Sequence, residues 1–354
     1  MNGDFAARLI AWQRLHGRHG LPWQGTKDAY RIWLSEIMLQ QTQVGTVIPY
    51  YLAFLERFPD VVSLAASDID SVLRLWSGLG YYSRARNLHG AACEVMARHD
   101  GIFPRDRETL ESLPGVGRST AAAIAAFAFG AREAILDGNV KRVLARHFAV
   151  AGFPGEAKVA HQLWDIAEAV LPRQGIAPYT QALMDLGATV CTRTPACERC
   201  PVHDTCQARA QDNVAAYPGT RQRKAVPVRT TRMLLLFNQG RLLLEKRPPV
   251  GIWGGLWSFP EVSMDEDVVS VCEARFGLVV DAIRPLPALK HSFTHFTLNI
   301  HPVQCRVRTD CRVADSAATQ WMDPDYAAME AVPVPVKKLL VRLKAEPGQA
   351  TDHL

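Results

Sequence analysis

The segment Leu113–Ala121, with the sequence Leu-Pro-Gly-Val-Gly-Arg-Ser-Thr-Ala, constrains the fold more than any other part of the chain. Pro114, Gly115 and Gly117 predict a tight turn that enters an alanine-rich helix. The first backbone N–H groups of a helix have no partner within that helix. Gly115, Val116 and Gly117 therefore present donors that fit a nucleic-acid phosphate.

An acidic turn, Leu136–Lys141, follows the hairpin segment. Its acid, Asp137, comes 20 residues after Gly117. A purely structural DNA clamp has no reason to hold a carboxylate near a phosphate. The pair therefore indicates chemistry on DNA rather than binding alone.

A second acid lies on a predicted helix, Tyr30–Gln43. Glu36 is one turn from Ile32 and Trp33 on one side and from Leu39 on the other, so we expect its carboxyl to be desolvated. Desolvation raises the pKa of a carboxyl, and a protonated acid near neutral pH is what a leaving base needs. The plainer alternative is a surface glutamate that borders the core.

Two further segments have side chains suited to DNA. Gln40 and Gln41 offer amide donors and acceptors that match base edges. The segment Trp76–Arg86 places Tyr81 on a glycine turn beside two arginines, and an aromatic side chain on such a turn can wedge into a base stack. The alternative is a helix-breaking turn whose tyrosines pack inward. Together with the hairpin and Asp137, these residues favour an enzyme that acts on DNA.

The chain divides into two predicted domains, because 354 residues exceed the usual size of one. Apolar residues recur at the helical period to about residue 190, which predicts an all-α domain over 1–218 that includes a cysteine loop. A basic, proline-containing linker is expected at 219–231, and short β-type runs with two helices predict an α+β domain over 232–354. The predicted helices of the first domain are Tyr30–Gln43, Thr46–Phe58, Asp68–Trp76, Ser83–Arg98, Arg118–Phe129, Val140–Phe148, Glu156–Val170 and Tyr179–Val190, and the elements of the second are Met233–Phe237, Arg241–Lys246, Glu266–Phe276, Phe296–Val307 and Val334–Lys344.

Four of the eight cysteines crowd into sixteen residues with the spacing C-x5-C-x2-C-x5-C. In a chain of the reducing cytosol such a cluster holds metal more often than it forms disulfides. Four thiolates suit either a [4Fe–4S] cluster or a structural zinc, and the residues alone leave both open. The four are Cys191, Cys197, Cys200 and Cys206.

The charge balance bears on the partners of the chain. A formal net charge of +5 permits a polyanionic partner without requiring one. The N-terminus lacks the apolar core of a signal peptide, and no run of roughly 18 apolar residues occurs. We expect a cytoplasmic monomer that associates with the nucleoid through DNA and has no membrane partner.

These motifs taken in order resemble the helix–hairpin–helix DNA glycosylases with an iron–sulfur loop, and most closely the branch that removes adenine mispaired with 8-oxoguanine. The resemblance covers nearly the whole chain. The segments that match are Leu21–Trp23, Trp33–Val44, Gly78–Leu88, Leu113–Thr120, Leu136–Leu144, Met184–Gly187 and Gly251–Pro260.

The resemblance implies roles for the site residues. Glu36 is expected to protonate the adenine ring, Asp137 to stabilise the positive sugar, and Asn139 to position the water or the sugar. Tyr81 and Gln41 are expected to occupy the opened stack beside the flipped-out adenosine. The expected partner is double-stranded DNA with an A:8-oxoG or A:G mispair.

Position 119 distinguishes two reaction types within the family. Relatives that also cut the DNA strand have a Schiff-base lysine where this chain has Ser119. Without that amine, simple hydrolysis that leaves an abasic site is expected. Ser119 itself belongs to the expected DNA-binding hairpin. Lys141 is close to Asp137 in sequence but is not expected to be a nucleophile.

The second domain resembles a Nudix module, yet Gly254–Gly277 lacks the acidic helix that binds magnesium in Nudix hydrolases. Recognition is therefore expected rather than hydrolysis. The tract with Phe293, Thr294 and His295 resembles the loop that contacts the oxidised guanine, with threonine where the family more often has serine. Threonine retains the hydroxyl, so the hydrogen bond is retained. The alternative is an ordinary strand with alternating aromatic residues.

The resemblance also implies that the four cysteines hold a [4Fe–4S] cluster. The gap between Cys191 and Cys197 is one residue shorter than is usual in the family, and we expect the loop to tighten and still bind the cluster. Three other functions compete with adenine excision: DNA binding without catalysis, nucleotide hydrolysis by the second domain, and a glycosylase with lyase activity on damaged pyrimidines. The two acids Glu36 and Asp137 argue against DNA binding without catalysis. The absent acidic helix argues against nucleotide hydrolysis, and Ser119 argues against lyase activity.

Overall fold

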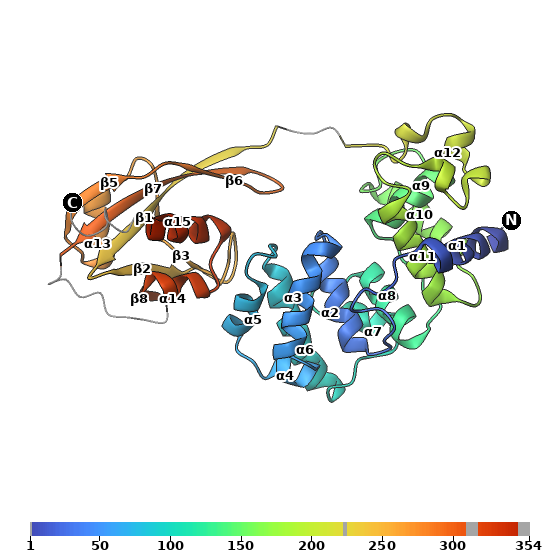
Figure 1. The fold of residues 1–354 in the computed structure, drawn as a ribbon, viewed down its shortest axis with the longest axis horizontal. Helices are drawn as coiled ribbons and strands as arrows, with labels where there is room; N and C mark the ends of the chain where they lie inside the picture. The colour runs from blue at the N-terminus through green and yellow to red at the C-terminus, as the bar shows by residue number, and fades with distance from the viewer. Residues whose placement is uncertain (1, 222–224, 309–317, 346–354) are drawn as a thin grey trace. The chain divides into compact units, whose positions relative to one another are not determined.

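A computed structural model describes residues 2–221, 225–308 and 318–345 of the protein (Figure 1). The chain forms two compact units. The first contains residues 1–67 and 87–223, and the second contains residues 68–86 and 224–354. An all-α domain with a cysteine loop is followed by a mixed-sheet domain, so the predicted fold class is confirmed.

The helices of the first unit begin and end close to where the sequence predicts them. The Arg118–Phe129 helix has the predicted bounds, and the other predicted helices differ by one to four residues at an end. The first helix, α1, has no counterpart among the predictions. The bounds are α1 Asn2–His16, α2 Ala29–Leu39, α3 Val44–Arg57, α4 Val61–Ala65, α6 Ser83–His99, α7 Arg107–Ser112, α8 Arg118–Phe129, α9 Gly138–His147, α10 Ala157–Ala169 and α11 Ile176–Thr189, followed by α12 Gln207–Ala210 in the cysteine loop.

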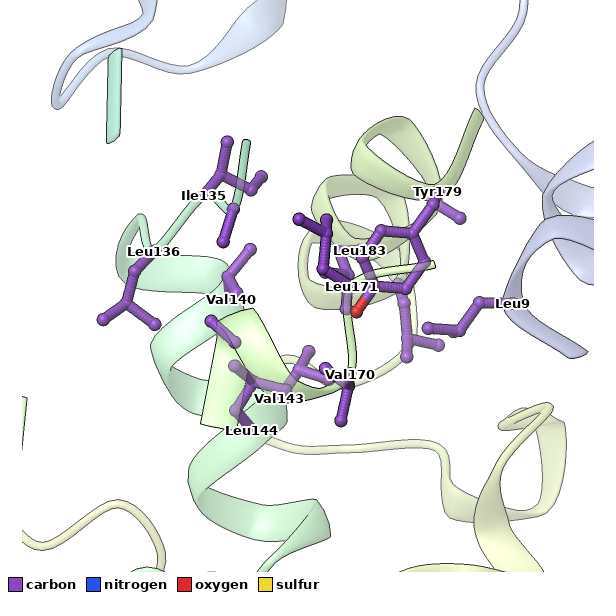
Figure 2. Close-up of a cluster of buried hydrophobic side chains, with 14 of the residues drawn as sticks. Leu9, Ile135, Leu136, Val140, Val143, Leu144, Val170, Leu171, Tyr179 and Leu183 are labelled. Atoms are coloured by element: carbon purple, nitrogen blue, oxygen red, sulfur yellow. The ribbon is translucent and has the colours of Figure 1, made fainter. Parts of the chain in front are cut away.

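A buried apolar cluster fixes the turn that contains Asp137 (Figure 2). Leu136 and Val140 flank this turn, and both side chains are buried among residues of α9, α10, α11 and α1. Burial of such side chains contributes about 1.5–3 kcal/mol each. The acid is therefore held between two anchored neighbours, with little freedom in its backbone.

The described residues of the second unit form an eight-stranded sheet with helices. The main path of the sheet has the order β3-β2-β1-β7-β5, and the long central pair β1–β7 is parallel. Elsewhere the strands pair antiparallel, with β8 on β2, β6 on β7 and β4 on β1. The bounds are β1 Val228–Asn238, β2 Arg241–Lys246, β3 Trp257–Ser258, β4 Glu261–Val262, α13 Val268–Phe276, β5 Val280–Pro285, β6 Leu289–Ser292, β7 Thr297–Val307, β8 Thr319–Met322, α14 Pro324–Met329 and α15 Val334–Ala345.

The segment 68–86, with helix α5 Ile69–Trp76, belongs to this second unit although it comes from the helical half of the sequence. Arg74 forms an ion pair with Glu330 at 3.3 Å. Lys246 reaches Asp70 at 2.5 Å. These contacts attach the segment to the sheet domain, which the sequence did not predict.

The expected linker at 219–231 is partly strand, since β1 begins at Val228. Residues 222–224 of that linker lie outside the described residues. No helix in the described part of the chain has the length and apolar character needed to cross a bilayer.

Candidate active site

A cavity of about 640 Å³ opens in the first unit beside helix α2. Its walls come from the loop that contains Arg18 and Trp23, from Glu36 on α2, and from Gln181 and Met184 on α11. The volume lies in the usual range for small-ligand sites. Carboxyl, guanidinium and amide groups thus converge on one apolar-walled cavity of small-ligand size.

Glu36 has the properties of a general acid. The side chain keeps some accessible surface because it faces the cavity, but protein atoms surround it on its other sides. Burial, together with the smaller effect of the negative charge of Asp137, raises the pKa of the carboxyl to about 8. Glu36 is therefore protonated at neutral pH and is able to donate that proton, as its apolar neighbours on α2 predict.

Asp137 is the N-cap residue of α9 and accepts a hydrogen bond from the Val140 amide at 2.7 Å. Burial raises its pKa, while the amides of Val140 and Asn139 and the cations Arg142 and Lys141 oppose that rise. These groups stabilise the anion of Asp137, and its negative charge acts on Glu36. One protonated and one ionised carboxyl thus lie near each other.

Asn139 connects the Asp137 turn to the cysteine loop through Arg142. The Arg142 guanidinium donates to Asn139 Oδ1 at 2.8 Å and to the Cys191 carbonyl at 2.7 Å. A Cβ on Gly187 of α11 would lie 2.6 Å from Asn139 Cβ, so only glycine permits this approach of α9 and α11. The Asn139 amide is therefore held in one orientation, with its oxygen toward Arg142.

The sequence did not predict a buried ion pair that lies beside Glu36. Asp185 of α11 is fully buried, and it accepts bonds from the Arg18 amide at 3.0 Å and from Arg18 Nε at 2.7 Å. Gln181 Nε2 also donates to Asp185, at 2.9 Å. The only sequence signal was that Met184–Gly187 belongs to the matched segments. The two partners lie 167 residues apart, which no local pattern reveals.

We expect Asp185→Asn to slow the chemistry at this site by about 10–100-fold, because hydrogen bonds to charged groups contribute about 1.5–3 kcal/mol each. The change leaves the Arg18 cation without its counter-charge and frees Gln181 to rotate. Single-turnover kinetics measure the rate. Asp165→Asn removes an exposed pair on α10 and serves as the matched control with an unchanged rate. An Asp185→Asn rate within twofold of the wild-type rate contradicts the role.

The hairpin between α7 and α8 has the expected turn, but the Val116 amide donates to the Leu113 carbonyl at 3.1 Å and so does not present the donor that the sequence predicts. Gly115 has φ +77°, and a Cβ there would lie 2.8 Å from the Asn87 side chain. Gly117 caps α8 and faces open space. Gln40 donates to the Gly115 carbonyl at 3.3 Å, which connects the end of α2 to the hairpin. Ser119 accepts from the Leu136 amide at 3.0 Å, so its hydroxyl helps to hold the Asp137 turn.

Gln41 and Tyr81 share an unusual backbone conformation. Both are non-glycine residues in the left-handed region, with φ of 59° and 49°. Such residues cost about 1 kcal/mol or more and often mark functional turns. Both side chains are exposed. Gln41 belongs to the first unit and Tyr81 to the second.

The second unit has its own cavity, of about 520 Å³, between the segment 80–86 and the sheet domain. The rings of Phe293 and Phe296 stack with 4.4 Å between their centroids. The Phe293 amide donates to the Phe296 carbonyl at 2.8 Å, which closes a turn. Thr294 and His295 are exposed at the tip of this turn. The Tyr81 hydroxyl lies 3.4 Å from Thr294 Oγ1. Two residues from distant predicted motifs therefore meet at one cavity.

The four clustered cysteines line one small cavity after α11, together with Arg146 and His203. Burial, together with the charges of the other three cysteines, raises the pKa of Cys200 to about 11, although a backbone hydrogen bond from Val202 lowers it. Arg146 approaches Cys191 Sγ at 3.4 Å. In the described part of the chain, no three His, Cys, Asp or Glu side chains form a group that could hold a single metal ion. The donor set at this cavity is four cysteine sulfurs, whose chemistry suits either an iron–sulfur cluster or a zinc ion.

Two family models match the chain. The model for the HhH-GPD superfamily of base excision DNA repair proteins matches residues 34–169, and the model for the NUDIX domain matches residues 232–342. The first range contains both carboxyls, Glu36 and Asp137. The second contains Thr294.

Curated relatives match over the full length. The adenine DNA glycosylase of Buchnera aphidicola (subsp. Baizongia pistaciae) is 36% identical, over 96% of this chain and 97% of its own. The chain belongs to the adenine DNA glycosylase family. The human adenine DNA glycosylase is 32% identical, over 95% of this chain and 73% of its own. The protein is thus a DNA glycosylase of base excision repair that acts on adenine.

Solved structures are similar to the helical domain of this adenine DNA glycosylase. A thermostable thymine-DNA glycosylase has a TM-score of 0.55 and 29% identity, over 59% of this chain and 97% of its own. Endonuclease III in a non-covalent complex with DNA has a TM-score of 0.51 and 19% identity, over 60% of this chain and 98% of its own. The latter similarity shows the fold, a helix–hairpin–helix domain with helices on both sides of the hairpin.

Proposed function

We propose that this adenine DNA glycosylase is monofunctional and hydrolyses the N-glycosidic bond of adenine paired with 8-oxoguanine, and more slowly of adenine paired with guanine. The main support for hydrolysis is the pair of carboxyls that ionise at different pH, with Glu36 protonated near neutrality beside an ionised Asp137. Departure of a purine builds positive charge on the sugar, which one acid and one anion together stabilise.

The reaction begins with adenine in the cavity that Glu36 lines, outside the base stack. Glu36 donates its proton to a ring nitrogen, the C1′–N9 bond breaks, and the bond electrons leave with the base. Asp137 stabilises the oxocarbenium ion. A water molecule adds to C1′ and its proton returns to Glu36, while Asn139 positions the water or the sugar. The products are adenine and an abasic site.

Hydrolysis rather than lyase chemistry is supported by Ser119, whose hydroxyl is engaged with the Leu136 amide. A Schiff base requires an amine, which this position lacks. We expect A:8-oxoG duplexes to release adenine with the strand intact until alkali is added. Strand cleavage without alkali at the rate of adenine release would refute monofunctional hydrolysis.

Contacts to DNA are assigned to the hairpin and to the exposed turns. The amides of Gly115 and Gly117 bind a phosphate of the adenine strand, whereas the Val116 amide donates to the Leu113 carbonyl at 3.1 Å. Gln40 supports this hairpin from α2. The exposed Gln41 and Tyr81 enter the opened stack. The protein is proposed to act as a monomer on nucleoid DNA in the cytoplasm.

Recognition of 8-oxoguanine is assigned to the cavity of the second unit, with Phe293, Thr294 and His295. The alternative, nucleotide hydrolysis, requires acids that are free to bind magnesium. Two acids of the sheet domain are instead neutralised by arginine, Glu245 by Arg275 and Glu261 by Arg247. This pairing supports a recognition module.

We expect Thr294→Val to reduce the preference for A:8-oxoG over A:G by about fivefold, because one hydrogen bond contributes roughly 1 kcal/mol. Valine keeps the shape of threonine but removes the hydroxyl near Tyr81. Thr294→Ser retains the hydroxyl and is the matched control with the preference unchanged. Dissociation constants for the two duplexes measure the effect. Equal preference in the valine variant and the wild type would show that the hydroxyl does not read the lesion.

The cysteine loop is proposed to hold a [4Fe–4S] cluster through Cys191, Cys197, Cys200 and Cys206. Such a cluster supplies covalent cross-links that shape the loop. We expect about four iron atoms and four inorganic sulfides per chain, with visible absorption, and loss of both in Cys200→Ser. Cys93→Ser, at an exposed cysteine outside the loop, leaves the metal content unchanged. One zinc per chain in a colourless protein contradicts the cluster.

A further inference from the structure

Helix α15 presents an exposed stripe that the proposed function does not use. Its other side buries Pro335, Val336, Leu339 and Leu340 in the sheet domain. The stripe recurs at positions i, i+3, i+4, i+7 and i+8, which places its members on one helix face. These five exposed residues, which we call the basic stripe, also line a shallow depression by themselves: Val334, Lys337, Lys338, Val341 and Arg342.

The sequence around the basic stripe contains no acidic residues. Residues 331–345 contain no Asp or Glu, and neither do residues 282–309, which include β6 and the turn with Thr294. Arg342 donates to the neutral carbonyl of Pro287 at 3.2 Å, so its charge is not cancelled there. The lysine that does form an ion pair, Lys344 with Asp325, lies outside the stripe. The face is therefore positively charged.

The stripe is continuous with the cavity of the second unit. Val334 lines both the stripe depression and the cavity with Thr294. Lys338 is close enough to His291, another cavity residue, for its charge to act on the imidazole. From Val334 to Arg342 the helix rises about 12 Å, which spans roughly three nucleotides along one DNA strand.

We propose that the basic stripe binds the phosphodiester backbone of the DNA strand whose base occupies the cavity with Thr294. Lysine and arginine fit phosphates as charge partners, while the stripe has no amide or carboxylate suited to base edges. The two exposed valines pack against deoxyribose. This inference rests on the proposed function, because the recognised base fixes which strand runs along α15.

Salt dependence of binding tests the proposal. Each phosphate that a protein neutralises contributes about −0.9 to the slope of log K against log salt. The full chain binds a duplex in which the adenosine opposite 8-oxoguanine carries a 2′-fluorine, which disfavours the sugar cation and prevents cleavage. Affinity is measured by fluorescence anisotropy from about 50 to 200 mM salt. We expect the triple variant Lys337→Gln, Lys338→Gln, Arg342→Gln to flatten the slope by about 2–3.

Lys344→Gln removes a cation of the same helix outside the stripe and is the matched control, with an unchanged slope. Each single stripe variant should flatten the slope by about one unit. Adenine release at saturating enzyme should equal that of wild type in all variants, which shows that they fold. A wild-type slope in the triple variant overturns the proposal. Failure of the wild type to prefer A:8-oxoG refutes the proposed function instead.

Discussion

Glu36→Gln is expected to reduce the single-turnover rate of adenine release by at least about 1,000-fold. The loss of a general acid alone accounts for about 100–10,000-fold. Glutamine keeps the size and the hydrogen-bonding shape of the side chain but has no proton to give to the leaving base. Glu94→Gln, at an acid of α6 that pairs with Arg98, is the matched control and should act like the wild type. Wild-type release by the Glu36 variant would exclude Glu36 as the acid.

The pH dependence of the rate follows from the same carboxyl. Its pKa of about 8 lies above the usual range, so the acid is protonated below that pH and loses its proton above it. The rate should therefore be level near pH 7 and fall as the pH rises through 8, by about tenfold per unit. In the Glu36→Gln variant, the residual rate should not show this fall as the pH rises through 8.

Burial of Glu36 also affects stability. A carboxyl with a raised pKa in the folded state binds its proton more tightly there than in the unfolded chain, so folding loses stability as pH rises from about 4.5 to 8. Each unit of difference corresponds to about 1.4 kcal/mol. Glu36→Gln should therefore raise the free energy of unfolding at pH 8 while it abolishes activity. The raised pKa of Glu36 therefore lowers the stability of the enzyme near neutral pH, but it keeps the acid protonated there.

Local chemistry explains which features the sequence reveals. Helix α8 begins after Gly117 as predicted, because glycine and proline have conformational rules that act within a few residues. Glu36 was recognised for a similar reason, since the helical period fixes its apolar neighbours on α2. Helix α1 was missed because its apolar periodicity is weak, although Asp4 lies in its first turn and Arg14 and His16 lie in its last.

Features that depend on distant residues were not predictable. Arg18 and Asp185 are 167 positions apart, and a buried ion pair follows from how α11 packs beside the loop after α1. The association of residues 68–86 with the sheet domain likewise depends on pairs such as Arg74 and Glu330, 256 positions apart. The resemblance identified which segments contain site residues. Only the folded structure shows how those segments contact one another.

Asp137→Asn separates the two roles that the structure gives to one side chain. Asparagine caps a helix as well as aspartate does, so the bond to the Val140 amide and the start of α9 should remain. The negative charge is lost, and with it the stabilisation of the sugar cation. We expect adenine release to slow by about 100–1,000-fold, the effect of removing one electrostatic stabiliser of a transition state.

The stability of the Asp137→Asn variant should be equal to or above that of the wild type at neutral pH, because burial disfavours the charged carboxylate. Asp60→Asn makes the same change at an exposed N-cap, that of α4, and should alter neither rate nor stability by much. Single-turnover kinetics and denaturant unfolding on the three proteins decide between the roles. If Asp137→Asn releases adenine at the wild-type rate, Asp137 is only a helix cap, and the sugar cation must be stabilised by another group. A slow but fully stable variant instead shows that the charge itself acts on the sugar, on a helix start that either residue can cap.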